Sequence, residues 1–258
     1  MKLKVANWNV ERPKPNTSKT NLVLKKIIEV DADIFILTET SDAIDLSGIF
    51  PYQVSTTSYP RTPNEQWVSV WSKFPITQQY KTIDSNRTVS ARITSSIGCI
   101  LVYGTIIPYH MAGVKGVRYG NLNYNPWQFH LEDISNQSLN WNEIITTNED
   151  AYFILAGDFN QTRGVNYGYG TTDARNILTE KLAKSKLKCL TEQNQIEPFL
   201  SIDSKNGNKR NNIDHICASE KLINACTDIN ISAWDHFAED GRYMSDHNGV
   251  AVQFNINP

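Results

Sequence analysis

The sequence predicts an α/β protein in which two mixed β-sheets pack face to face and helices lie outside them. Short runs of β-branched and aromatic residues dominate the pattern, and such runs are typical of strands. Long helical patterns separate only some of these runs, so a plain alternating parallel sheet is disfavoured. No linker, internal repeat or low-complexity tract interrupts the 258 residues, and we therefore expect one domain over residues 1–258.

Eight apolar runs carry the strand prediction. They are Leu3 to Trp8, Ile34 to Leu37, Trp67 to Ser72, Thr88 to Ile93, Ile100 to Ile107, Tyr152 to Ala156, Ile213 to Ala218 and Val250 to Ile256. Three other segments have their apolar residues at helical spacing, namely Ser18 to Val30, Pro126 to Ile145 and Asp173 to Lys184. We expect Asp173 to cap the last of these helices by accepting hydrogen bonds from its first free N–H groups.

The composition is that of a globular enzyme, with 40% hydrophobic and 20% charged residues. The net charge of −2 excludes the overall basic field of a protein that grips long stretches of duplex DNA, so a polyanion would have to be held locally. No apolar run reaches the length of a signal peptide or of a membrane span. The four cysteines form no CxxC pair, and we expect a cytoplasmic monomer with reduced thiols that does not associate with membranes.

Polar residues follow or precede the apolar runs at five places, where a strand delivers side chains to the rim of a sheet. The five motifs are Asn7-Trp8-Asn9-Val10-Glu11, Leu37-Thr38-Glu39-Thr40, Gly157-Asp158-Phe159-Asn160, Asn212-Ile213-Asp214-His215-Ile216 and Ser245-Asp246-His247-Asn248. Each motif alone has a simple structural explanation. An acidic residue such as Glu39 is also common at a strand end that faces solvent. The motif from Gly157 to Asn160 also suits an Asx turn that ends a strand.

The last two motifs combine carboxylates with histidines. Asp246 and His247 offer an acid for a hard cation and an imidazole for a phosphate from one turn. Alternation along a strand sends Asp214 and His215 to opposite faces, so only one of them can easily serve a given site. We expect Asp214 to orient His247 and His215 to pack.

In this order the five motifs resemble those of the endonuclease/exonuclease/phosphatase superfamily, and Ser72-Lys73-Phe74-Pro75-Ile76 is similar to an internal strand-turn element of that superfamily. The resemblance spans nearly the whole chain. It implies a four-layer αββα sandwich and the hydrolysis of phosphodiester bonds with Mg²⁺, or alternatively Mn²⁺. Nucleic acid is the commonest substrate of the superfamily, which favours a nuclease.

The resemblance also implies roles for individual residues. Asn9, Glu39 and Asp246 match metal-site positions, with Glu39 as the principal ligand. Asp158 matches the residue that positions or activates the attacking water. The remaining catalytic positions match Asn160, which would bind the phosphate and the water, His247, which would contact the scissile phosphate, and Asp214, which would hold that histidine.

The sequence departs from the superfamily pattern at several substrate-facing positions. Ile106 stands where many relatives place a histidine or tyrosine, and only a loop that curls back would let Tyr109 or His110 replace it. Glu11 stands where repair-type members often carry an aspartate, and it either touches the metal or faces solvent. The candidate substrate-binding residues are therefore Glu11, Tyr109, His110, Arg118, Arg163 and Asn166, with the loops Ala112 to Asn125 and Ser201 to Asn212 as the expected readers of the substrate.

Two alternative functions remain open from the sequence. One is an inositol or lipid phosphatase or a sphingomyelinase-like phosphodiesterase, although Ala156 replaces the tryptophan that usually precedes Gly-Asp in inositol phosphatases. The other is a binding module that keeps the fold but has weakened catalysis, as the isoleucine at position 106 would allow.

Overall fold

The computed structural model describes residues 1–57, 62–117, 123–202 and 209–257. Its strands are β1 (Lys2–Asn9), β2 (Ile34–Ser41), β3 (Tyr52–Ser55), β4 (Glu65–Ser72), β5 (Ile76–Tyr80), β6 (Thr88–Ser95), β7 (Gly98–Ile106), β8 (Tyr152–Asp158), β9 (Leu187–Cys189), β10 (Asp214–Ser219), β11 (Cys226–Trp234) and β12 (Gly249–Ile256). Its helices are α1 (Ser18–Val30), α2 (Gln128–Thr146), α3 (Thr172–Lys184), α4 (Gln193–Ile196), the 3-10 turn η1 (Glu197–Phe199) and α5 (Glu220–Ala225).

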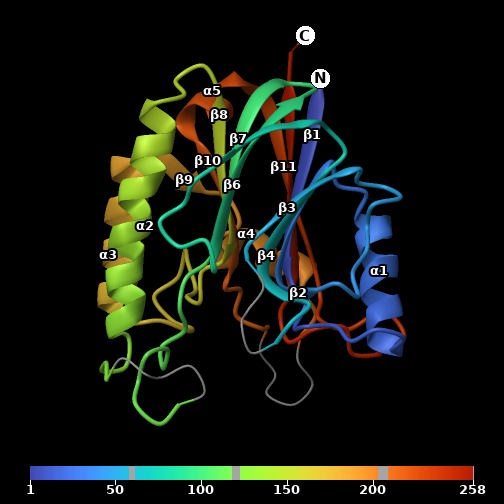
Figure 1. Ribbon diagram of the computed structural model, residues 1–258, viewed down its shortest axis with the longest axis vertical. Helices are drawn as coiled ribbons and strands as arrows, with labels where there is room; N and C mark the ends of the chain where they lie inside the picture. Colours follow the sequence, from blue (N-terminus) through green and yellow to red (C-terminus); the bar gives the residue numbers. More distant parts are fainter. Residues whose placement is uncertain (58–61, 118–122, 203–208, 258) are drawn as a thin grey trace.

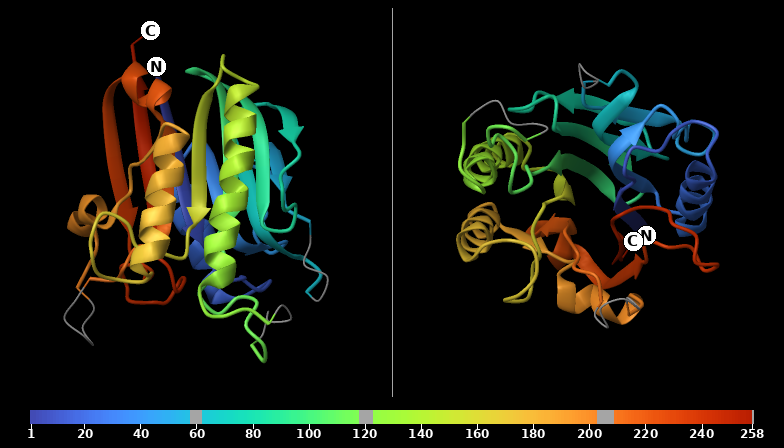
Figure 2. Two further views of the ribbon diagram at one scale, coloured as in Figure 1. Left: turned by 90° about the vertical axis from the view of Figure 1, so that its left-hand side faces the viewer. Right: turned by 90° about the horizontal axis from the view of Figure 1, so that it is seen from below.

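The strands form two six-stranded sheets that lie face to face (Figure 1). The first sheet has the order β11-β12-β1-β2-β4-β3 and the second β5-β6-β7-β8-β10-β9. Each sheet is mixed, because β1 and β2 run parallel in the first and β7 and β8 in the second, while the other pairs are antiparallel. Helix α1 covers the first sheet, and α2 and α3 cover the second (Figures 1 and 2). These four layers confirm the predicted fold class.

Three apolar clusters hold the layers together. The largest lies between the sheets and joins residues such as Leu3 of the first sheet to Ile154 of the second. Another joins α1 to the first sheet around Trp8, and the third joins α2 and α3 to the second sheet around Tyr103 and Trp141. All five of these side chains are fully buried, so both faces of the central strands are apolar, as their nearly unbroken hydrophobic runs predict.

Alternation along the central strands explains why polar residues enter the layer between the sheets. On β1 the face that carries Leu3 and Val5 in the core continues with Asn7 and Asn9, both of which are fully buried. The polar residues therefore lie at the end of β1 that is far from Met1.

The second sheet repeats this arrangement. Ala156 belongs to the core between the sheets, and Asp158 follows it on the same face of β8. Asp214 begins the face of β10 that continues with Ile216 in the same core, and it pairs with Asp158 across the two strands. The core between the sheets thus changes from apolar to acidic at one end.

The predicted elements are all present, and the additional elements and the different helix cap have local causes. Every predicted strand and helix is found, but β3, β5, β9 and β11 were not expected. The cap of α3 is Thr171, whose side chain accepts a hydrogen bond from the backbone N–H of Ala174 at 3.1 Å, so the prediction that Asp173 caps this helix is wrong. Asp173 instead lies in the first turn, where its negative charge still suits the helix dipole.

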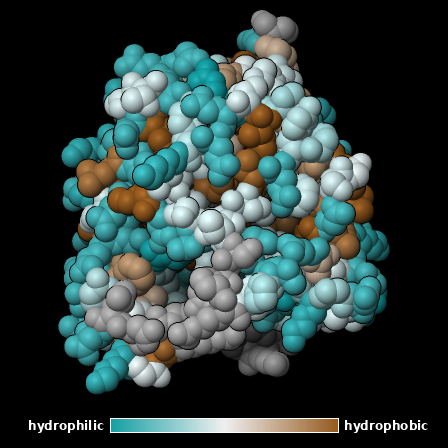
Figure 3. Space-filling view, viewed as in Figure 1, coloured by the Kyte–Doolittle hydropathy of each residue, from teal (hydrophilic) through white to brown (hydrophobic). Residues whose placement is uncertain are grey.

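The surface is mainly hydrophilic on the face shown in Figure 3, where hydrophobic residues form small separate groups. In the described part of the chain, no helix has both the length and the apolar character that a membrane span requires.

Candidate active site

The five sequence motifs meet at one end of the layer between the sheets. Both termini lie at the opposite end of the molecule (Figure 1). Strands β1, β2 and β8 bring the motifs at their carboxyl ends to this place, and β10 and β12 bring the motifs at their amino ends, because they run antiparallel to their neighbours. Residues from position 9 to position 247 therefore gather around one point.

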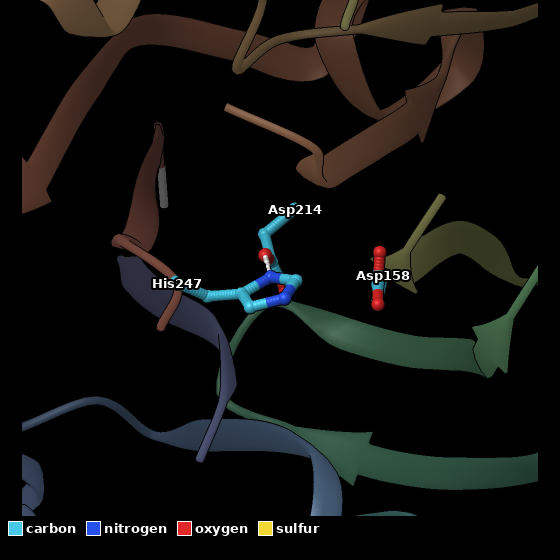
Figure 4. Close-up of side chains that lie close together, drawn as sticks. All are labelled: Asp158, Asp214 and His247. Carbon is cyan, nitrogen blue, oxygen red and sulfur yellow. Dashed lines mark hydrogen bonds and ion pairs between the residues drawn. The ribbon is translucent and has the colours of Figure 1, made fainter. Parts of the chain in front are cut away.

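The centre of the site is an imidazole between two carboxylates. The Nδ1 of His247 lies 2.5 Å from Oδ2 of Asp214, and Asp158 faces the ring from the other side (Figure 4). One ligand-type atom from each of these three residues lies within 4.8 Å of the other two. Asp214 is fixed in turn by Nδ2 of Asn7, which donates to its Oδ1 at 3.2 Å.

The electrostatics of this group follow from its burial. Burial alone would lower the pKa of His247, but the charges of Asp214 and Asp158 outweigh it and raise the pKa to about 10. Burial together with the charge of Asp214 raises the pKa of Asp158 to about 7, although the charge of His247 opposes the shift. Near neutral pH the site therefore holds an imidazolium beside a carboxyl group that is close to its own midpoint.

Asp158 is held by three polar contacts. Its Oδ1 accepts the backbone N–H of Asn160 at 2.8 Å, and its Oδ2 accepts Nδ2 of Asn160 at 3.1 Å and Nδ2 of Asn9 at 3.3 Å. The amide of Asn160 also donates to the backbone oxygen of Ile107 at 2.9 Å, which ties β8 to the end of β7. Asn160 adopts a positive φ of 48°, a conformation that asparagine tolerates better than most residues.

Gly157 brings β8 close enough to β7 to build this corner. Its φ is 152°, and a Cβ atom at this position would lie 1.8 Å from the backbone oxygen of Thr105. Its own carbonyl oxygen accepts Nδ2 of Asn7 at 3.1 Å. Only glycine permits this approach, so its place before Asp158 has a packing reason as well as the turn that the sequence predicted.

Glu39 reaches the site because the backbone turns at this residue. Its φ is 47°, and such a conformation is uncommon for a residue with a side chain and is often found at functional sites. The Nη1 of Arg12 lies 2.5 Å from Oε2 of Glu39, and the backbone N–H of Arg12 donates to the carbonyl oxygen of Glu39 at 2.6 Å. Burial raises the pKa of Glu39, against the opposing charges of Arg12 and His247.

Asp246 gives the clearest sign that the acidic residues suit a cation. Its Oδ1 is buried and has no hydrogen-bond partner in the described part of the chain, and the Nε2 of His247 lies 3.8 Å from it. The carboxylates of Glu39 and Asp246 and the amide of Asn9 are the oxygen donors that Mg²⁺ prefers. In contrast, the group of Asp158, Asp214 and His247 already uses Nδ1 of His247 in its contact with Asp214, so it is better described as an ion pair.

His215 lies on the other face of β10, as the alternation along this strand predicts. Its Nδ1 lies 3.0 Å from the backbone oxygen of Thr191 and its Nε2 lies 3.0 Å from that of Gln161. The ring is fully buried and packs against Phe159. Its contacts are thus structural, whereas those of Asp214 belong to the site.

Two of the candidate substrate-binding residues have structural partners instead. Glu11 accepts hydrogen bonds from Nζ of Lys19 at 2.5 Å and from the hydroxyl of Tyr243 at 2.7 Å, and its role toward a metal or substrate stays a prediction. Arg163 is buried, and its Nη1 donates to the hydroxyl of Thr179 in α3 at 2.8 Å. Arg163 thus helps to hold α3, and its assignment to the substrate stays a prediction.

The segment after β7 partly curls back toward the site. Ile106 is buried in the core between the sheets and offers no polar group. His110 follows it, and its Nδ1 lies 2.6 Å from the hydroxyl of Tyr169, a residue whose pKa is raised by burial and by the nearby charge of Asp158. Tyr109 packs edge-on against His110, with ring centroids 5.8 Å apart.

Asn166 and Arg118 complete the set of candidates. Asn166 is exposed in the loop that follows β8. Arg118 lies outside the described residues.

Sequence reasoning missed two residues of the site. Asn7 was quoted only as part of a motif, although alternation places it on the same face as Asn9 and thus beside Asp214. Arg12 had no role, and its contact with Glu39 depends on positive φ angles of 52° at Glu11 and 46° at Arg12 that no periodic pattern reveals. The only hint of a role for Arg12 in the sequence is that this basic residue directly follows the first polar motif.

Comparison with known proteins agrees with the fold and the motifs. The model of the endonuclease/exonuclease/phosphatase family matches residues 6–247. No curated protein matches the chain in sequence. An AP endonuclease from Archaeoglobus fulgidus is similar in structure with a TM-score of 0.69 and 17% identity, over 98% of this chain and 100% of that chain.

Two further solved structures share the fold. A 3′ phosphatase from Neisseria, bound to a product DNA hairpin, has a TM-score of 0.68 and 15% identity, over 98% of this chain and 99% of that chain. Sphingomyelinase C from Streptomyces griseocarneus has a TM-score of 0.64 and 16% identity, over 99% of this chain and 100% of that chain. Since the family model extends from the first polar motif to His247, the chain belongs to the endonuclease/exonuclease/phosphatase family of hydrolases that act on phosphodiester bonds.

Proposed function

We propose that this protein is a divalent-metal-dependent phosphodiesterase that cleaves nucleic acid, with Mg²⁺ as its ion and Mn²⁺ as a substitute. The observation that carries the proposal is the position of His247 between the buried carboxylates of Asp214 and Asp158, near enough to Glu39 for its charge to act on that acid. A buried cation beside acids with shifted pKa values is typical of a catalytic site.

The residues have complementary roles in the proposed hydrolysis. Asp158 in its carboxylate form accepts the proton of a water molecule whose oxygen attacks phosphorus, while the bond from phosphorus to the leaving oxygen breaks. The imidazolium of His247 stabilises the negative charge that grows on the phosphate oxygens, and Asp214 holds the ring in place. Asn160 positions Asp158 through two hydrogen bonds and lies beside the phosphate.

Glu39, Asp246 and Asn9 would hold the metal ion, which when bound neutralises charge on the phosphate. Two observations support this assignment: the buried Oδ1 of Asp246 accepts no hydrogen bond in the described part of the chain, and burial raises the pKa of Glu39 although Arg12 and His247 oppose the shift.

Nucleic acid is favoured over other phosphodiesters by a group of aromatic residues that includes Tyr169, on whose pKa the charge of Asp158 acts. The rings of Trp127 and Tyr169 have centroids 5.3 Å apart, and those of His110 and Trp127 are 5.7 Å apart. Aromatic surfaces of this kind suit stacking of unpaired bases. The AP endonuclease and the DNA-bound 3′ phosphatase among the similar structures agree with this choice, whereas the sphingomyelinase C keeps a lipid substrate as the alternative to be tested.

The test is a turnover assay of the purified protein with and without Mg²⁺ on several substrates. These are bis-p-nitrophenyl phosphate, single- and double-stranded DNA, RNA, inositol phosphates and sphingomyelin. We expect cleavage of nucleic acid that EDTA abolishes, and we expect Glu39→Ala to lower kcat/KM by about 100-fold or more at a fixed Mg²⁺ concentration.

The matched control is Glu29→Ala, which removes an exposed carboxylate on α1 and should leave activity unchanged. Full activity in EDTA would contradict metal dependence. If the protein turns over only sphingomyelin or inositol phosphates, nucleic acid is not its substrate. If it binds one of these substrates without turnover, it is a binding module.

A further inference from the structure

The side chain of Arg12 lies on the carboxylate that is expected to bind the metal. Its Nη1 lies 2.5 Å from Oε2 of Glu39, and its Nε lies 3.4 Å from Oε2 of Glu65. The guanidinium carbon is 4.7 Å from the centre of the Trp67 ring, which it covers. Arg12 thus bridges two acids on an aromatic surface at the edge of the site.

The backbone holds Arg12 in this place against its ordinary preference. Glu11, Arg12 and Glu39 all have positive φ angles, of 52°, 46° and 47°. The backbone hydrogen bond from Arg12 to the carbonyl oxygen of Glu39 joins the two turns. Three such residues in contact are maintained only where the surroundings determine the conformation, so the pairing is a built feature of the loop.

The charge of Arg12 conflicts with a metal at the same carboxylate. An arginine side chain stays protonated in proteins, so it cannot give up its charge when a cation arrives. A divalent ion on Glu39 would repel the guanidinium, which lies in direct contact with the same oxygen. The Arg12 side chain is 23% exposed and already lies 3.4 Å from Glu65, so a guanidinium that leaves Glu39 keeps an acidic neighbour.

The released guanidinium has a suitable partner in the substrate. Its planar fork matches the oxygens of a phosphate as well as those of a carboxylate. The same end of the core holds His247, and the two leading positive charges on Glu39 come from Arg12 and His247. A phosphate bound beside His247 would therefore lie at the same carboxylate on which the charge of Arg12 also acts.

We propose that Arg12 is a phosphate-binding residue that exchanges Glu39 for the substrate phosphate when the metal ion binds, so that metal and phosphate bind cooperatively. The proposal rests on the proposed metal-dependent function. Before the metal binds, Arg12 occupies the carboxylate of Glu39, and this competition weakens the binding of an incoming ion. With metal, Arg12 is free to bind the phosphate, and linkage requires that each ligand strengthens the binding of the other by the same factor.

The test is calorimetric titration with Mg²⁺, with inorganic phosphate, and with each in the presence of the other. In the wild-type protein we expect phosphate to increase the affinity for Mg²⁺ by about fivefold or more, and the reverse effect to be equal. In Arg12→Ala we expect Mg²⁺ alone to bind at least about fivefold more tightly, and the coupling to phosphate to fall below about twofold. Arg12→Lys, which keeps the charge but loses the fork, should retain the weaker metal binding and lose most of the coupling.

The matched control is Arg242→Ala, which removes an exposed arginine paired with Asp240 and should change neither affinity. Wild-type affinities in both Arg12 variants, with coupling intact, would overturn the proposal while leaving the metal-dependent function in place. A wild-type protein that binds no Mg²⁺ and turns over in EDTA would instead overturn the proposed function and the exchange with it. Thermal melts of each variant show whether the fold is kept.

Discussion

Replacing Asp214 by asparagine should make the charge of His247 depend on pH near neutrality. The pKa of His247 is about 10 in the wild-type protein because the carboxylates of Asp214 and Asp158 outweigh the effect of burial. The amide of asparagine has nearly the same shape, so it can still accept the hydrogen bond from Asn7 and can donate to a neutral Nδ1. The change therefore removes a charge and keeps the packing.

The magnitude follows from the titration of the imidazole. Asp214 makes the largest contribution that raises the pKa, so its loss should lower the pKa of His247 from about 10 toward about 6.5, the ordinary value of a histidine. At pH 8 the protonated fraction would then fall from nearly all to about 3%, a loss of about 30-fold in the active form. At pH 6 most of the imidazole would still be charged, and the loss from this cause would be less than about twofold.

The assay combines NMR titration of the histidine ring protons with the pH dependence of kcat. The chain has five histidines, and the spectrum of a His247→Asn variant identifies the signal. Asp228→Asn, which changes an exposed acid on β11, is the matched control and should leave the titration unchanged. A pKa near 10 for His247 in the Asp214→Asn protein, or one near 6.5 in the wild-type protein, would refute the reasoning.

Two other variants test the acidic and the glycine positions of β8. Activity of the wild-type protein should rise as the pH passes about 7, because the raised pKa of Asp158 keeps it protonated below this value, and Asp158→Asn should remove this limb and lower kcat by about 10²–10⁴. The same raised pKa means that protonated Asp158 stabilises the metal-free fold fully below the ordinary carboxyl pKa, and that this contribution is lost as the pH rises through about 7. Thermal melts of the wild-type protein and Asp158→Asn at several pH values would show this loss. Equal changes of melting temperature with pH in the two proteins would contradict it. Gly157→Ala would place a Cβ atom 1.8 Å from a backbone oxygen of β7 and should destabilise the protein by more than about 4 kcal/mol in urea unfolding. Gly48→Ala, with nothing within 4 Å of its added atom, should change stability by less than about 1 kcal/mol, and similar unfolding midpoints for the two variants would disprove the packing argument.

The central part of the fold was predictable because its strands are buried on both faces. Runs such as Ile34 to Leu37 and Tyr152 to Ala156 leave few alternatives to a core strand, and the structure places them in β2 and β8. Edge strands were missed because backbone pairing with a neighbour defines them more than burial does. Strand β5, with the sequence ITQQY, is largely exposed and gains its form from β6.

Strand β11 shows a different cause of failure. Its residues Ile229, Ile231 and Ala233 do alternate toward the core, but an aspartate precedes them and an asparagine and a serine lie between them, which lowers the strand propensity. The helix cap was misplaced because Thr171 and Asp173 are both good caps and sequence alone does not say which of them ends the extended segment.

For the candidate site, too, some features were predictable from the sequence and others were not. The proximity of Asp158, Asp214 and His247 was predictable because strand order brings the ends of predicted strands together, and one ligand-type atom of each lies within 4.8 Å of the others. The contacts of Arg163 with Thr179 and of Glu11 with Lys19 were not predicted, because both partners lie in helices whose packing no local pattern fixes. Single-sequence reasoning thus located the charges of the site better than it located their partners.

The position of β12 between β11 and β1 has a consequence for the order of folding. Strand β1 pairs with β2 early in the chain, but its other edge stays open until β12 has been synthesised, since Lys2 pairs with Asn255. Contacts of such long sequence separation close slowly and leave an exposed edge in the meantime. Because Asp246 and His247 immediately precede β12, the same late event that closes the sheet also delivers the histidine. A partly folded chain would therefore be inactive, and recovery of activity during refolding would report the closure of the first sheet.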